Sequence, residues 1–129
     1  ESIEIPNSVT SISGGVEINS AFFELNLKEV IFEDNSKLTE IKDYLFSNNQ
    51  LANIEIPNSV TTIGISAFQN NLLTNVVIPN SVTTMNDRVF YDIPSITVHV
   101  PWKEGEKPEG WADNWAANSS GTVTIDYAK

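Results

Sequence analysis

Cysteine is absent from the 129-residue sequence, and histidine occurs once, as His99. Without thiols the chain has neither a disulfide framework nor a thiolate metal site. Nucleophilic catalysis needs a serine, threonine or cysteine beside a base, and a single histidine offers little from which to build such a pair. We therefore predict that the chain is not an enzyme, with no catalytic residue, no metal site and no cofactor.

Basic residues are also scarce. The sequence has 7 Lys and Arg against 17 Asp and Glu, a formal net charge of −10 at pH 7. Nucleic-acid affinity comes largely from Lys and Arg that displace counterions, so nucleic acid is not expected as a partner. No run of 18 or more apolar residues is present, which argues against membrane insertion. The length fits one domain.

A repeated segment is the most informative feature that is present. The segment IEIPNSVTTIGISAFQNN begins at Ile54, VVIPNSVTTMNDRVFYD begins at Val76, and IEIPNSVTSIS begins at Ile3. The prolines Pro57, Pro79 and Pro101 are spaced 22 residues apart. A more divergent unit fits the same frame, although its turn, EDNSK, is two residues longer than PNS; its apolar residues are Val30, Phe32, Leu38, Ile41 and Phe46.

Each unit reads L-x-x-I-x-I-P-N-S-V-x-x-I-x-x-x-A-F and is too short to fold alone, so the units are expected to stack. The alternation at Leu51, Ile54 and Ile56 predicts a strand with one face inward, ended by proline and an Asn-Ser turn. A second extended piece, 60–63, precedes a short Ala-Phe segment that we expect to form one helical or 3₁₀ turn. Successive right-handed coils then place their strands side by side in a parallel sheet.

The stacking predicts columns of like residues along the molecule. One column is apolar and inward: Phe22, Phe46, Phe68 and Phe90. Another is hydroxyl-bearing and outward: Thr10, Thr39, Thr61 and Thr83. Flat threonine arrays can bind ice, but the neighbouring column contains Glu40, whose charge breaks the array.

The segment IPNSVTTIGISAF resembles the BspA-type leucine-rich repeat of bacterial surface proteins, over residues 1 to about 101. The resemblance implies a β-rich α/β leucine-rich-repeat solenoid with coils of about 22 residues. It also implies a secreted or bacterial cell-surface protein that serves adhesion or protein binding. Two departures mark places where the stack is expected to bulge or end: about five extra residues in SGGVEINSA, between Ile12 and Phe22, and Ser95 in place of a repeat leucine.

The domain prediction is a solenoid over 1–101 and a C-terminal cap over 102–129 that packs on the last coil. In the cap, Trp111 and Trp115 have helical spacing and are expected to cover the core, while Trp102 is expected to be exposed; TVTIDYA predicts a last strand over 122–127. At the other end, the frame places a repeat leucine immediately before Glu1, so we expect the chain to begin inside a repeat.

Two other groups of residues could suggest a metal or phosphate site, but their sequence context favours ordinary loops and turns. The acidic residues Glu104, Glu106, Glu109 and Asp113 lack the spacing of a calcium loop and are interleaved with lysines, which favours a solvated loop. Gly14 and Gly15 lack the context of a phosphate loop and are expected to form a turn.

Three function classes remain: a protein-binding module, a structural spacer or stalk that displays another domain, and, last, an enzyme. The expected partner of a binding module is a protein, either a host extracellular protein or a cell-wall component. The predicted binding face consists of the outward x positions of L-x-x-I-x-I, because aliphatic side chains alternate there with hydrogen-bonding ones. This predicted ligand-contact face comprises Ile31, Asn53, Glu55, Asn75, Val77, Ile96, Thr97 and His99.

Overall fold

A computed structural model describes residues 1–15 and 19–129 and shows an all-β chain. Residues 16–18, which belong to the predicted insertion, lie outside the described residues. The strands are β1 (Ser2–Ile5), β2 (Glu29–Phe32), β3 (Glu40–Ile41), β4 (Thr62–Ile63), β5 (Asn75–Val77), β6 (Thr84–Met85), β7 (Ser95–His99) and β8 (Thr122–Asp126).

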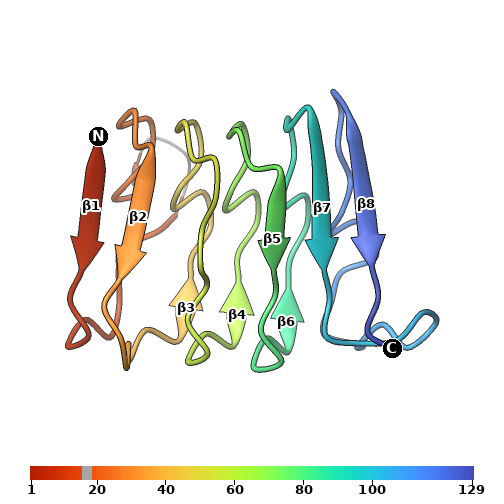
Figure 1. Ribbon diagram of the computed structural model, residues 1–129. Coiled ribbons are helices and arrows are strands. Elements are labelled where there is room, and N and C mark those ends of the chain that lie inside the picture. Colours follow the sequence, from red (N-terminus) through yellow and green to blue (C-terminus); the bar gives the residue numbers. More distant parts are fainter. Residues whose placement is uncertain (16–18) are drawn as a thin grey trace.

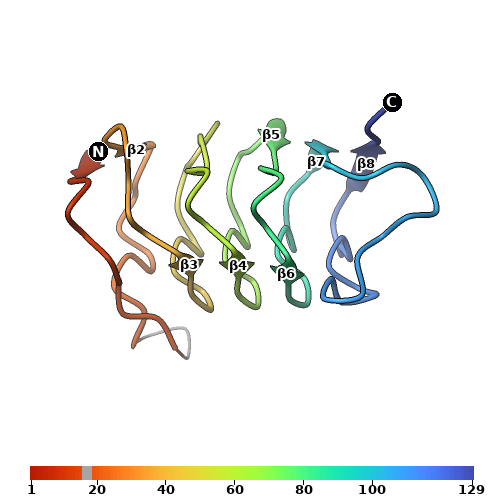
Figure 2. The same cartoon turned by 90° about the horizontal axis from the view of Figure 1, so that it is seen from below.

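The strands form two rows on opposite sides of the molecule (Figures 1 and 2). One row contains β1 paired with β2, followed by β5, β7 and β8; the other row is the continuous sheet β3–β4–β6. Every pairing between named strands is parallel, as the repeat predicts. Thr62 pairs with Glu40 on one side and Thr84 on the other, so equivalent residues of successive units are neighbours.

The expected helical turn at the Ala-Phe segment is wrong for the unit that contains Ala67. There the backbone makes isolated turn bonds, from Ala67 N to Gly64 O at 3.3 Å and from Gln69 N to Ser66 O at 3.1 Å. No α-helix occurs among the described residues, so the α/β part of the predicted fold class is replaced by β. The helical turn does not form beside Ala67 because Ser66 adopts a left-handed conformation, with a φ of 51°, which a right-handed helix excludes.

The phenylalanine column is confirmed and forms the centre of the core. The ring centroids of Phe22, Phe46, Phe68 and Phe90 are separated by 5.7, 5.8 and 5.9 Å along the stack, with interplanar angles of 3° to 11°. Leucine, isoleucine and valine from both strand rows pack around them. Like residues therefore lie above one another, as stacked units require.

The predicted strand at 54–56 does not form. Residues 53–56 run between β2 and β5 (Figure 1) but pair with neither; β2 pairs only with β1, and β5 only with β7. Ile78 and Val100 stand at the position of Ile56 in the next two units, where the stacking predicts neighbours, and these two do lie on consecutive rungs, since Ile78 N donates to His99 O at 2.9 Å. Ile56 does not join that ladder. The interruption coincides with the longer turn that follows β2, where Asn35 has a φ of 63°.

Residues 102–129 lie against the last unit and continue its path. Ala112 N donates to Met85 O at 2.8 Å, Val89 N donates to Trp115 O at 3.1 Å, and β8 pairs with β7 along its whole length. Trp111 and Trp115 are buried, as predicted. Trp102, expected to be exposed, is instead partly buried, because its ring packs against both of these tryptophans and against Tyr127.

Candidate protein-binding face

The outward side of the row that contains β2, β5 and β7 carries most of the predicted ligand-contact face. Val77 is 65% exposed and Ile31 is 45% exposed. Asn53, Glu55 and Asn75 are also exposed. Thr97 and His99 are half-exposed and pair with Asn75 and Val77 on the neighbouring strand. Seven of the eight predicted residues therefore share one accessible surface.

The prediction for Ile96 is wrong, because its side chain is buried at 2% exposure. Strand β7 starts at Ser95, earlier than β5 starts in its own unit, and its side chains alternate strictly along its length. Ile96 therefore shares the inward face with Val98.

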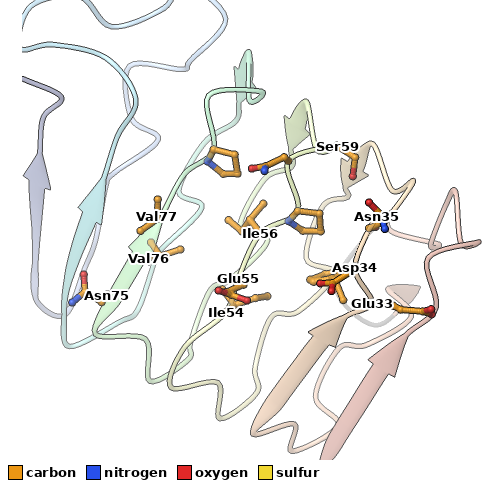
Figure 3. Close-up of a pocket in the computed structure, with 15 residues that line it drawn as sticks. Glu33, Asp34, Asn35, Ile54, Glu55, Ile56, Ser59, Asn75, Val76 and Val77 are labelled. Carbon is orange, nitrogen blue, oxygen red and sulfur yellow. The ribbon is translucent and has the colours of Figure 1, made fainter.

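A groove of about 700 Å³ opens where the sheet is interrupted (Figure 3). Its walls are the turn after β2, the unpaired segment 54–59 and the outer face of β5. A second hollow of about 380 Å³ lies between β2 and residues 53–55 and shares Phe32, Ile54 and Glu55 with the first. Together the two hollows are lined by Ile31, Asn53, Glu55, Asn75 and Val77 of the predicted face.

The groove is acidic. Glu33, Asp34 and Glu55 line it, and no lysine, arginine or histidine does. Glu33 is engaged, because its carboxylate accepts a hydrogen bond from Asn7 N at 3.1 Å. Within 1–15 and 19–129, the ion pairs involve His99 and Lys107 and lie outside the groove. Asp34 and Glu55 are exposed and form no ion pair with any of these described residues. The arrangement suits a cationic ligand.

His99 has partners that the sequence pattern does not reveal. Its Nδ1 lies 2.6 Å from an Asp126 carboxylate oxygen, and its Nε2 lies 2.5 Å from Asn75 Oδ1. The three side chains come from β7, β8 and β5, so they form a polar bridge across three neighbouring strands. No serine, threonine or cysteine belongs to this bridge, which makes it a surface contact between strands rather than a nucleophile–base pair.

Two buried asparagines were also missed by sequence reasoning. Asn49 accepts hydrogen bonds from the backbone amides of Leu25 and Leu27 at 3.0 and 2.9 Å. Asn71, 2% exposed, accepts one from Leu51 N at 3.0 Å and donates to the carbonyls of Phe46 and Phe68 at 2.9 and 3.0 Å. The recurrence of an Asn-Asn pair after a 22-residue interval was the available signal. These residues join successive units instead of facing a ligand.

The acidic loop near the C-terminal end is solvated. Asp113 is fully exposed and lies 3.3 Å from Lys107 Nζ, which also donates to Trp111 O at 2.6 Å. In the part of the chain that the structure describes, no three His, Asp or Glu side chains are grouped so as to hold a metal ion. Nor does that part contain a helix of the length and apolarity needed to cross a membrane.

Comparison with known proteins gives one family match and one similar structure. The structure is the pneumococcal vaccine antigen PcpA, with a TM-score of 0.71 and 24% identity over 97% of this chain and 30% of that chain. At this identity the likeness shows the fold alone, and the chain spans less than a third of that protein. We found no significant match among curated protein sequences. The family model for the BspA type leucine-rich repeat region matches in six copies over residues 1–104, and the chain therefore belongs to this family.

Proposed function

We propose that the chain is a non-catalytic, adhesin-like segment of a secreted or cell-surface bacterial protein. In this proposal, 1–101 forms a right-handed solenoid with coils of about 22 residues, and 102–129 caps its last coil. The partner is a protein, either a host extracellular protein or a cell-wall component. Membership of the BspA-type family supports this proposal, because leucine-rich repeats serve mainly to present a surface to other proteins.

The proposal rests mainly on the exposure of Val77 and Ile31 on the sheet face. An aliphatic side chain that is 65% exposed gains little from burial within its own chain, yet it gains about 25 cal/mol per Å² of apolar surface when a partner covers it. Asn53 and Asn75 lie on the same face and offer hydrogen-bond donors and acceptors between the aliphatic groups. Mixed apolar and polar surface of this kind is typical of protein interfaces.

The test is affinity capture from a panel of purified host extracellular and cell-wall proteins, with Ile31→Lys/Val77→Lys beside the wild type. The matched control is Leu72→Lys, because Leu72 is 55% exposed but lies outside both hollows. We expect the double variant to lose its partner and the control to retain it, with both melting near the wild-type temperature. Capture that survives the double variant would refute the sheet face as the site, and a wild type that captures nothing would favour the spacer.

A further inference from the structure

We propose that two copies of this chain associate through the open edge of β8, with the two strands antiparallel, so that one sheet continues across both copies. This inference goes beyond the proposed function, because it concerns a different surface and a partner of known sequence. Three observations lead to it: the free edge of β8, the lack of protection on that edge, and the complementarity of the strand to itself.

Strand β8 has a partner on one side only. It pairs with β7 along its whole length, and no other strand of the described chain adjoins it (Figure 1). Val100 N donates to Asp126 O at 2.9 Å, so the backbone groups of Asp126 point toward β7. Backbone groups of successive strand residues point to opposite edges. Those of Val123 and Ile125 therefore point toward the open edge, where no described residue binds them.

The aromatic core is closed at this end of the molecule. The ring of Trp115 lies edge-on to Phe90, at an interplanar angle of 77°, instead of continuing the phenylalanine stack. Trp115 and Trp111 are buried, at 2% and 1% exposure. On β8, by contrast, the inward side chains of Val123 and Ile125 are only half-buried. The apolar surface that remains uncovered here therefore lies along the edge of β8.

The edge of β8 lacks the features that usually prevent strands from associating. Proline, lysine, a bulge or a very short strand are such features. Strand β8 has five residues in continuous register with β7, and it contains neither proline nor lysine. Its one charged side chain, Asp126, is engaged by His99, whose Nδ1 lies 2.6 Å from the carboxylate. The other end of the row differs, because β1 carries Glu4 and is followed by Pro6.

Antiparallel pairing centred on Thr124 makes β8 complementary to itself. Thr124 then faces its own counterpart, and Val123 faces Ile125 of the second copy. The backbone groups of this apolar pair point to the open edge, so the pair exchanges both hydrogen bonds while its half-buried side chains cover one another. Thr122 faces Asp126, so no like charges meet across the interface.

Charge disfavours the alternative, in which β8 of one copy continues the parallel row onto β1 of the next. Glu4 and His99 hold the same position in the repeat, and Asp126 pairs with His99. Stacking in the register of the chain would therefore place the carboxylates of Asp126 and Glu4 opposite each other. The antiparallel arrangement avoids this contact and gives a closed dimer with two-fold symmetry instead of a filament.

The dimer has a consequence for binding. A sheet that continues through both copies keeps side chains of one face together, so the outward faces of the two copies lie on the same side. A surface that displays many copies of a ligand then meets two binding faces at once, which raises the avidity without a new contact.

The experiment measures association by analytical ultracentrifugation over a concentration series, with circular dichroism to confirm the fold of each variant. Thr124→Lys and Thr122→Lys add the same charge at exposed positions of the same strand, so an effect of net charge alone changes both equally. The first places two ammonium groups opposite each other, whereas the second places one opposite Asp126. Thr124→Glu is mixed with Thr124→Lys so that opposite charges meet.

We expect the wild type to form a dimer as its concentration rises, with slower hydrogen exchange at the amides of Val123 and Ile125. Thr124→Lys should weaken dimerisation at least about fivefold, while Thr122→Lys should leave it within about twofold or strengthen it. The mixture of Thr124→Lys with Thr124→Glu should restore it.

Four results would overturn the inference. They are a wild type that stays monomeric up to about 1 mM, species larger than a dimer, equal effects of the two lysine substitutions, and no restoration by the mixture.

Discussion

Replacing Asn71 with alanine should destabilise the chain more than its small size suggests. The side chain is 2% exposed and lies between two successive units. Its oxygen accepts from Leu51 N, and its amide group donates to the carbonyls of Phe46 and Phe68. Alanine removes all three interactions. Leu51 N and Phe68 O then have no other hydrogen-bond partner among the described residues, whereas Phe46 O keeps the hydrogen bond from Asn49 Nδ2 at 3.0 Å.

The magnitude follows from the groups left unsatisfied. A buried backbone donor or acceptor that loses its partner costs about 1 to 3 kcal/mol. Two such groups, Leu51 N and Phe68 O, set a range of about 2 to 6 kcal/mol, and relaxation of the surrounding chain or entry of water moves the cost toward the lower end. We therefore expect Asn71→Ala to lower the free energy of unfolding by about 2 to 4 kcal/mol.

The assay is urea unfolding followed by tryptophan fluorescence and by circular dichroism. The adjacent Asn70 provides the control, because it is exposed, has a φ of 53° that glycine tolerates, and its side chain bonds only the half-exposed side chain of Asn48. Asn70→Gly should change the stability by no more than about 0.5 kcal/mol. A loss below about 1 kcal/mol for Asn71→Ala, with an unchanged m-value, would show that the asparagine contacts do not stabilise the stack.

Three other substitutions test the core and the face. Trp115→Ala should cost about 3 to 5 kcal/mol in the same urea titration, since the buried ring covers Phe90; a cost near 0.5 kcal/mol would contradict burial. Ile96→Lys should cost at least about 3 kcal/mol because it buries a charge without a partner, whereas Val77→Lys should cost under about 1 kcal/mol; similar losses would place both side chains in one environment. Glu24→Asn should raise stability by about 0.5 to 1 kcal/mol in thermal melts, because asparagine tolerates a φ of 54° better; no gain would mean that this backbone is not strained.

The parallel strand pairing and the phenylalanine column could be predicted because both depend only on the repeat interval. Once Phe46, Phe68 and Phe90 occupy equivalent positions, stacking the units places their rings together without further information. The outward direction of Asn53, Glu55, Asn75 and Val77 follows from the same frame. In a repeated sequence, the position of a residue within one unit therefore predicts its neighbours in the units on either side.

The predictions that were wrong or incomplete concern places where a unit departs from the repeat. The prediction for Ile96 was wrong because it carried the repeat frame through Ser95, whereas β7 begins earlier than the frame implies and turns the side chain of Ile96 inward. The partner of His99 was missed because Asp126 lies on β8, outside the repeated pattern, where no sequence interval fixes the register. The open ladder at 53–56 was missed because hydrogen bonding depends on the separation of neighbouring units, which alternation alone does not report.

The open ladder has a consequence for the stability of the stack. Each backbone hydrogen bond that residues 53–56 do not make forgoes a net gain of about 0.5 to 1.5 kcal/mol, which is tolerable only because contacts beside the gap hold the units together. Asn71 supplies one of these contacts, since it bonds Leu51 N, two residues before the open segment, and Leu72 N donates to Leu51 O at the same residue. The longer turn at 33–36 is a feature in which one unit differs from the others beside this gap. The asparagine contacts therefore stabilise the stack next to the position where its sheet is interrupted.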